Sequence, residues 1–481
     1  MRNLSKQVFL NALACPVLGW LLRNGKMVTA PVNLGQRFRL EQGQEIGRRA
    51  RGLYPGGELI ADVNLVSAVR KTGGALASLA PAVFEGAFVV DGMAARADIL
   101  VRERGGWHLM EVKSGVNDRA EYVDDMAFTC AVAGACGLEP AAVSLVLVSR
   151  DYRLGMPDEA LFVTADHTDD VLARAQEFAS ILSEVESLTS CPERPDAGLI
   201  FECRHCELFR ECAGSGVDNH VFDLPRLSLS SFERLRELGI ERIEDIPEGF
   251  RLTGSQTRVR ECVLCGLPYV GRGLGPSLQE VEWPACYLDF ETVMTAIPLY
   301  PEVAPYETIP TQYSVHRCSR VGEVAEHREY LADSVRDCRR ELAEALLRDL
   351  GKQGSIITYS TFEKSVINAL ARLFPDLSEE LGALRKRIVD LEAIIRREYY
   401  HPSFHGSTSI KVTLPALVPD MSYRGLRIAD GDSAAAAFAY LAMGKDRYPE
   451  TTRKNLLRYC QQDTLAMVKL HEKLVQVAGL D

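Results

Sequence analysis

The chain has 481 residues, of which 47% are hydrophobic and 25% charged. At roughly 100–200 residues per domain, this length predicts two to four domains. The composition excludes long disorder, collagen-like repeats and coiled-coil arrays as the main architecture. The net charge of −11 argues against a protein that coats nucleic acid nonspecifically, because such proteins are usually basic. A local contact stays open, since residues 1–60 carry nine Lys or Arg against three acids.

Two interpretations fit the start of the chain. The apolar stretch 8–22 contains Leu13-Ala14-Cys15, which is typical of a lipoprotein signal. However, the stretch stays apolar after Cys15, and Ser5 could cap an amphipathic helix that carries Phe9 and Leu13. No apolar run approaches the ~20 residues of a membrane helix. We therefore expect a cytoplasmic protein, in which cysteine clusters more often bind metal than form disulfides.

We expect the first domain to span residues 1–215. Residues 1–60 are expected to form a helix, a basic segment and a second helix. Strands are expected at 83–90, 96–102, 107–113 and 143–149, with helices at 119–137 and 169–188. A cysteine-rich segment, 203–212, closes this part of the chain.

Three charged residues lie on two of these strands. Asp98 lies in one, and Glu111 and Lys113 lie two apart in the next, so they share a face. Two carboxylates could hold Mg²⁺, and a lysine beside the ion could stabilise the charge that develops on a phosphate. The alternative is a cross-strand ion pair at an exposed strand end.

Three cysteines with two and five residues between them predict a metal or cluster site. They are Cys203, Cys206 and Cys212, and soft thiolates this close in sequence favour such a ligand. Cys15 is the expected fourth ligand and Cys191 its rival. A zinc ribbon would need a second Cys-x-x-Cys about 15–20 residues on, and Cys262-x-x-Cys265 is much too distant.

Together these residues resemble the RecB-like PD-(D/E)xK nucleases that carry an iron–sulfur cluster, including the CRISPR adaptation exonucleases. The resemblance covers residues 1–215 and implies a restriction-endonuclease-like fold. It implies that Asp98, Glu111 and Lys113 are catalytic, with Mg²⁺ or Mn²⁺ on the two acids. It also implies a [4Fe–4S] cluster held by Cys15, Cys203, Cys206 and Cys212.

This chain departs from that family at two places. A histidine often follows the early Gly-rich helix, whereas Gly47 is followed by Arg-Arg-Ala-Arg. Tyr122 is present, but Thr129 stands where the family has Gln. A weakened nuclease, or a domain with only a structural role, is therefore an alternative.

Residues 216–282 predict a helical linker. Within it, 227–247 reads as a short helix, a Gly turn and a second short helix, similar to a helix-hairpin-helix. A plain helical spacer is the alternative. Residues 283–481 then predict a second α/β or α+β domain. Its strands are expected at 286–291, 312–316, 326–331, 355–359 and 387–391, with helices at 336–350 and 451–477.

A second set of acids lies in this domain. Asp289 and Glu291 share one face of a strand, and Tyr459 and Asp463 lie one turn apart on a helix. Two metal ions ~3.5–4 Å apart need several carboxylates, and a tyrosine hydroxyl can orient water. The arrangement resembles the DEDD exonucleases of ribonuclease H-like fold, in the Tyr-x-x-x-Asp subtype. The third acid is Glu363, which could instead belong to a Ser360-x-x-Glu363 capping box, and Asp390 is held in reserve.

The two halves together resemble a bacterial family that fuses a RecB-like nuclease domain to a DEDD-type domain. The segment 399–411 is also similar, and in it or just before it Arg396, Arg397, His405 and Lys411 could contact phosphate. The resemblance implies a metal-dependent nuclease with 3′–5′ exonuclease chemistry in the C-terminal domain. Single-stranded DNA is the expected substrate. The alternatives are an RNA exonuclease and a nucleic-acid-binding module whose N-terminal site is degenerate.

Overall fold

The computed structural model describes residues 2–27 and 31–480. The chain folds into two compact units. The first contains Met1–Gly198 and Met294–Glu307, and the second contains Leu199–Val293 and Thr308–Asp481. Segment 203–212 and residues 216–282 thus belong to the second unit. The connection 294–307 leaves the second unit and packs in the first, where Ala296 N donates to Oε1 of Gln42 over 3.0 Å.

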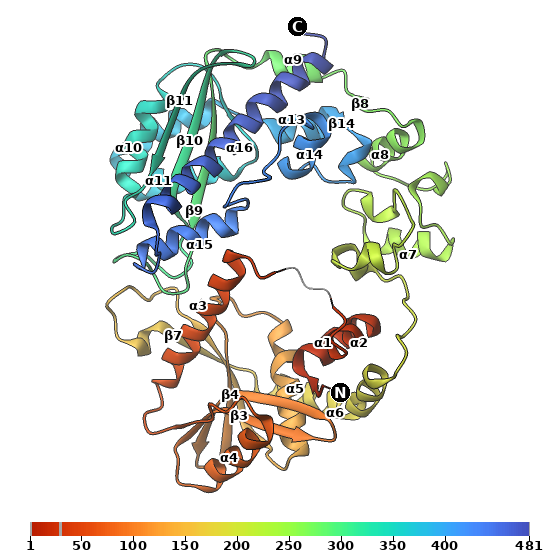
Figure 1. The fold of residues 1–481 in the computed structure, drawn as a ribbon, viewed down its shortest axis with the longest axis vertical. Coiled ribbons are helices and arrows are strands. Elements are labelled where there is room, and N and C mark those ends of the chain that lie inside the picture. Colours follow the sequence, from red (N-terminus) through yellow and green to blue (C-terminus); the bar gives the residue numbers. More distant parts are fainter. Residues whose placement is uncertain (1, 28–30, 481) are drawn as a thin grey trace. The chain divides into compact units, whose positions relative to one another are not determined.

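A mixed seven-stranded sheet forms the centre of the first unit (Figure 1). Its order is β2-β3-β4-β5-β6-β7, and β1 pairs in parallel with β4. β3, β4 and β5 are antiparallel neighbours, and β5 and β6 are parallel. The strands are β1 (Leu4–Ser5), β2 (Glu58–Leu59), β3 (Ala82–Val90), β4 (Met93–Glu103), β5 (Gly106–Val112), β6 (Pro140–Val148) and β7 (Phe162–Asp166).

Helices cover both faces of this sheet. They are α1 (Lys6–Ala14), α2 (Pro16–Arg23), α3 (Leu34–Arg51), α4 (Leu65–Ala77), α5 (Glu121–Ala135) and α6 (Thr168–Ser190). Neighbouring residues of a strand point to opposite faces of the sheet. Leu100 and Leu109 accordingly pack with Phe128 of α5 on one face, whereas Ile99 and Met110 pack with Ala50 of α3 on the other.

The first helix begins as the sequence predicts. Oγ of Ser5 accepts from Val8 N over 3.4 Å, so Ser5 is the N-cap of α1. Phe9 is fully buried, whereas Leu13 is 38% exposed. The apolar stretch therefore forms the two short helices α1 and α2, and both pack against α6.

The second unit contains a five-stranded sheet of order β11-β10-β9-β12-β13. β10 runs antiparallel to β9 and β11, while β12 runs parallel to β9 and β13. The strands are β9 (Ala285–Val293), β10 (Ile309–Arg320), β11 (Glu323–Leu331), β12 (Ile356–Thr358) and β13 (Ile388–Asp390). A separate pair joins β8 (Tyr269–Val270) and β14 (Tyr399–Tyr400).

Alternation along β9 again separates two cores. Leu288 and Phe290 pack with α10 (Arg339–Leu350), α11 (Phe362–Leu373) and α12 (Ser378–Lys386). Tyr287 faces the opposite side, where the core includes residues of the long C-terminal helix α16 (Pro449–Val477). The other helices here are α13 (Leu391–Glu398), α14 (Ile410–Leu417) and α15 (Gly431–Ala442). Asp289 and Glu291 follow the parity of Tyr287, which places them on the α16 side.

The segment 199–282 contributes to the same core as α16. It contains α7 (Leu229–Glu237), α8 (Gly254–Cys265) and α9 (Leu274–Gln279), and Phe232, Val259 and Leu278 are buried in that core. The helix pair expected at 227–247 is only half formed, because after Gly239 (φ 69°) the second element is a single 3₁₀ turn, Ile243–Asp245.

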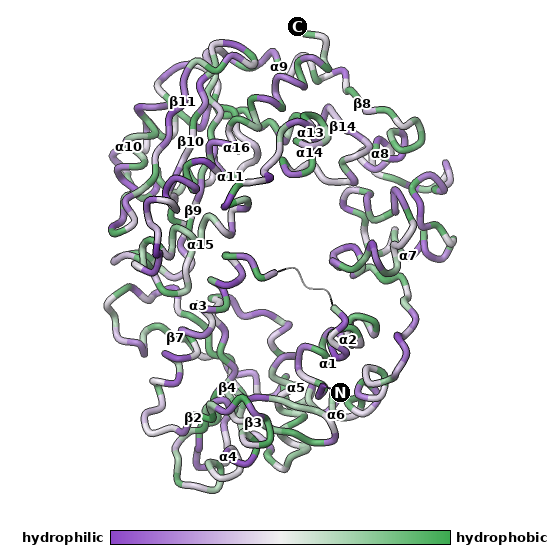
Figure 2. Tube along the Cα trace, in the orientation of Figure 1, coloured by the Kyte–Doolittle hydropathy of each residue, from purple (hydrophilic) through white to green (hydrophobic). Residues whose placement is uncertain are grey.

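Both units are mixed α/β structures, and the predicted α/β class is confirmed. Within the described residues, no helix combines the length and apolar character needed to cross a bilayer. The long helices α6 and α16 carry hydrophilic and hydrophobic stretches in turn (Figure 2).

Candidate metal centre

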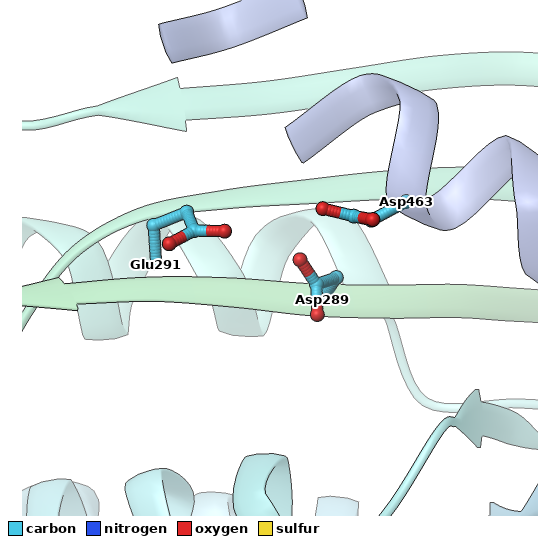
Figure 3. A group of neighbouring side chains, drawn as sticks. All are labelled: Asp289, Glu291 and Asp463. Carbon is cyan, nitrogen blue, oxygen red and sulfur yellow. The ribbon is translucent and has the colours of Figure 1, made fainter. Parts of the chain in front are cut away.

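Three carboxylates meet between β9 and α16. Asp289 and Glu291 project from one face of β9, and Asp463 projects toward them from α16 (Figure 3). One oxygen from each lies within 4.8 Å of the other two. In residues 2–27 and 31–480 this is the one group of three His, Cys, Asp or Glu side chains that comes together closely enough to hold a metal ion.

The electrostatics of this triad favour a cation. Burial and the neighbouring carboxylates raise the pKa of Asp289 and Glu291 well above their ordinary values. Burial raises the pKa of Asp463 to about 6, even though a tyrosine hydroxyl and the charge of Lys411 oppose the shift. Groups that resist ionisation this strongly are stabilised as anions by a bound divalent ion.

Two tyrosines hold Asp463. Tyr459, one turn earlier on α16, is buried, and its hydroxyl contact lowers the pKa of Asp463. The hydroxyl of Tyr423 donates to Oδ1 of Asp463 over 2.5 Å. The sequence analysis missed Tyr423, because it lies in the connection between α14 and α15, where no spacing relates it to the acids.

Glu363 lines a cavity together with two acids of the triad, Asp289 and Asp463. This cavity of about 270 Å³ is lined by Asp289, Tyr359, Ser360, Phe362, Glu363, Ile410, Asp463 and Met467. Glu363 is 3% exposed, and its Oε2 has no hydrogen-bond partner. Burial raises the pKa of Glu363 to about 7, with Asp390 adding to the shift, while its own backbone N–H and Ser360 oppose it.

The two candidates for the third acid differ in position. Asp390 is the N-cap of α13, where Oδ1 accepts from Ala393 N over 2.9 Å. Glu363 keeps the contact with Ser360, but Thr361 is the N-cap of α11 and makes no side-chain cap bond. Because Oε2 of Glu363 has no hydrogen-bond partner, this oxygen is the one that a ligand in the cavity could use.

A buried thiol and a lysine complete the surroundings. Sγ of Cys460 lies 3.6 Å from Oδ2 of Asp289. Lys411 is exposed, and its charge lowers the pKa of Glu291. The other basic residues considered for phosphate contacts have protein partners. Arg396 lies 4.0 Å from Glu392, Arg397 donates to Glu398 and Ser277, and His405 is 3.1 Å from Asp223.

The acids of the first unit also lie together. Nζ of Lys113 is 2.9 Å from Oε1 of Glu111, and Asp98 accepts from Val112 N over 2.8 Å. Burial, with the nearby charge of Glu111, raises the pKa of Asp98 to about 7. Burial opposes the charge on Lys113, but Glu111 and Asp125 outweigh it and raise the pKa of Lys113.

Two contacts here were missed from the sequence. Nζ of Lys6 lies 2.6 Å from the same Glu111 oxygen that Lys113 contacts, and Lys113 also pairs with Asp125. Oε2 of Glu111 is buried without a hydrogen-bond partner. A cavity of about 300 Å³ beside Asp98 has four of its eight lining residues on α3, Arg51 among them. Tyr122 lies beside the site, with Nζ of Lys113 5.2 Å from its ring centre.

The thirteen cysteines, all of which lie in the described residues, form no disulfide. Cys203 lies in a 3₁₀ turn (Phe201–His205), and Cys206 N donates to Cys203 O over 3.2 Å. Cys212 follows the next turn, Phe209–Glu211. Cys15 is in the first unit, as the N-cap of α2. The rival Cys191 ends α6, where Sγ contacts the carbonyls of Leu188 and Glu193.

One family model matches part of this chain. It is described as "Domain of unknown function (DUF2779)" and covers residues 286–409. The match contains Asp289, Glu291 and Glu363, and it ends before Tyr459 and Asp463. A search of the curated proteins found no match.

Proposed function

We propose that the second unit is a metal-dependent nuclease that removes nucleotides from the 3′ end of a nucleic-acid strand. The observation that carries the proposal is the triad: Asp289, Glu291 and Asp463 bring oxygens within 4.8 Å from a strand and a helix far apart in the chain. Such a set of converging acids is what metal-assisted phosphodiester hydrolysis uses. The five-stranded mixed sheet supports the ribonuclease H-like fold that the motif resemblance implies.

The donor set fits Mg²⁺ or Mn²⁺, which prefer oxygen ligands. Asp289, Glu291 and Asp463 would hold one ion, and Asp289 with Glu363 a second, because Oε2 of Glu363 is buried without a partner in the shared cavity. When bound, the ions would lower the pKa of water and neutralise charge on the phosphodiester.

The chain's own residues then determine the geometry of the reaction. Tyr459 would orient the attacking water, and the contact of its hydroxyl with Asp463 supports this role. The water oxygen forms a bond to phosphorus, and the bond from phosphorus to the 3′ oxygen of the preceding nucleotide breaks. That 3′ oxygen takes up a proton, and a nucleoside 5′-monophosphate leaves.

We also propose a PD-(D/E)xK nuclease site of restriction-endonuclease-like fold in the first unit, at Asp98, Glu111 and Lys113. A specific contact favours the alternative of a binding module: Glu111 already accepts two ammonium groups on one oxygen. These internal cations compete with a metal ion for that oxygen. Cys203, Cys206 and Cys212, with Cys15 as the fourth ligand expected from the sequence, are proposed to bind a [4Fe–4S] cluster.

The test is hydrolysis of end-labelled single-stranded DNA and RNA by the purified chain with Mn²⁺. Mononucleotide release that stops with EDTA and with Asp289→Ala supports the proposal. DNA is the expected substrate, and faster RNA hydrolysis would instead identify an RNA exonuclease. Binding without hydrolysis would identify a binding module.

A further inference from the structure

Lys6 brings a second ammonium group to the acids of the first unit. Its Nζ lies 2.6 Å from Oε1 of Glu111. Burial raises the pKa of Asp98, and the charge of Lys6 opposes that rise. Lys6 is one of the nine basic residues in the first 60, and the proposed function gives it no role. Its ammonium nevertheless acts on both acids of the proposed site.

The fold fixes the backbone at Lys6. The residue before it, Ser5, pairs with Ala94 of β4, the strand that also contains Asp98. Ser5 is at the same time the N-cap of α1, whose first residue is Lys6. The backbone of Lys6 is therefore held against the sheet, and its contact with Glu111 belongs to the folded domain. A movement of the ammonium toward a ligand needs only rotation within the Lys6 side chain.

The two lysines at Glu111 differ in the number of acids that hold them. Lys113 pairs with Glu111 and with Asp125, whereas in the described part of the chain the one ion-pair partner of Lys6 is Glu111. The side chain of Lys6 is also 25% exposed. An ammonium has three N–H donors, so a contact with one carboxylate oxygen leaves donors for another acceptor. Lys6 is therefore the cation at this site that an incoming anion can engage.

We propose that Lys6 binds a backbone phosphate of nucleic acid at the first site. The assignment rests on the proposed function of the first unit and extends it by one substrate contact. A phosphodiester that approaches Asp98 and Glu111 meets two acids, and a nearby cation offsets their repulsion. Lysine is a common phosphate ligand and acts there as a point charge. In the free chain, the contact with Glu111 keeps this ammonium at the site.

Schiff-base trapping detects such a contact at a single residue. The full chain is mixed in EDTA with a single-stranded oligonucleotide that carries one abasic aldehyde, and borohydride fixes each lysine that the aldehyde reaches. Peptide mapping should find the adduct on Lys6 and not on Lys71, a 52% exposed lysine of the same unit that pairs with Asp62. Trapping at other lysines but not at Lys6, or equal trapping at Lys6 and Lys71, would overturn the proposal.

Hydrolysis by the first unit gives a second readout, in the Asp289→Ala background. One phosphate contact changes the affinity for a single strand by about 5-fold in 0.1 M salt. Lys6→Ala should therefore raise KM by about that factor, with little change in kcat, and should make KM less dependent on salt. Lys6→Arg keeps the charge and should restore both properties. Unchanged KM and salt dependence in Lys6→Ala would also overturn the role of Lys6.

The outcomes keep this proposal and the nuclease proposal apart. An adduct on Lys6 without hydrolysis in the Asp289→Ala background would support phosphate binding by Lys6 and show that the first unit is a binding module. Hydrolysis that depends on Lys113, with no adduct on Lys6, would leave the first nuclease site standing and overturn the role of Lys6. A chain that binds no oligonucleotide would overturn both.

Discussion

The hydroxyl of Tyr423 donates a hydrogen bond to Oδ1 of Asp463 over 2.5 Å, although the two residues are 40 positions apart. The bond opposes the rise in the pKa of Asp463 that burial causes. Tyr423 therefore favours the ionised form of Asp463 and fixes the position of Oδ1. The segment between α14 and α15 thus contributes a contact to the candidate metal centre.

Removing this hydroxyl tests its role in metal binding. Tyr423→Phe should raise the pKa of Asp463 above about 6, so that a metal ion must displace a proton at neutral pH. A hydrogen bond to a charged group contributes about 1.5–3 kcal/mol. We expect Mn²⁺ affinity at pH 7, measured by calorimetry, to fall about 10-fold, with a smaller loss at pH 8.5. Tyr448→Phe, at a 62% exposed tyrosine, is the control and should bind Mn²⁺ normally.

The raised pKa of Glu363 leads to a prediction of how the free energy of unfolding depends on pH in the absence of metal. Its pKa rises from 4.5 to about 7 in the fold, so its contribution is complete below pH 4.5 and is lost as pH rises through 7. The loss is about 3 kcal/mol, at 1.36 kcal/mol per pKa unit. Urea unfolding in EDTA should therefore show lower stability at pH 8 than at pH 5.5.

Variants separate this contribution from the rest of the chain. Glu363→Gln cannot ionise and should make the decline between pH 5.5 and 8 less steep, because only the other buried acids with raised pKa values then contribute to it. Glu379→Gln, at an exposed position on α12, should leave the decline unchanged. An equally steep decline in Glu363→Gln would show that other groups cause it. Adding Mn²⁺ at pH 8 should stabilise the wild-type chain.

If Cys203, Cys206 and Cys212 bind an iron–sulfur cluster, protein purified without oxygen should contain iron and sulfide. Cys203→Ser and Cys15→Ser should each lower the iron content and the absorbance near 400 nm, because each removes a thiolate ligand. Cys265→Ser, at an exposed cysteine, is the control and should keep both. Colourless protein with stoichiometric zinc would show that the site is not an iron–sulfur cluster.

The first unit offers a prediction that separates catalysis from binding. If Asp98, Glu111 and Lys113 catalyse hydrolysis, Lys113→Ala should abolish the activity that remains in Asp289→Ala protein. Oligonucleotide binding should change little. If the first unit only binds nucleic acid, Lys113→Ala leaves hydrolysis unchanged. All hydrolysis then comes from the second unit and is lost in Asp289→Ala.

Much of the fold could be predicted because its patterns are local. The alternation around Asp289 indicated a strand whose acids share a face, and the strand is β9. The four-residue spacing of Tyr459 and Asp463 indicated one face of a helix, and the helix is α16. The short edge strand β7 was missed, since most of its residues are exposed and give no apolar period.

Other features of the site could not be read from local patterns. The sequence left Glu363 and Asp390 open, because Ser360-x-x-Glu363 also fits a capping box and Asp390 ends a predicted strand. Only the tertiary structure shows that Glu363 lines the cavity while Asp390 caps α13. Tyr423 lies in an irregular segment, so its contact depends on how that segment folds back on α16. Lys6 reaches Glu111 from 105 residues away, which no spacing rule predicts.

The measurement that tests the central claim most directly is mononucleotide release from 5′-labelled single-stranded DNA with Mn²⁺, in a Lys113→Ala background that removes the first site. The chain with Asp289 intact should shorten the strand stepwise from its 3′ end. Adding Asp289→Ala should stop the shortening, because it removes an acid shared by the triad and the cavity. Stepwise shortening that continues unchanged in the Asp289→Ala protein would contradict the account.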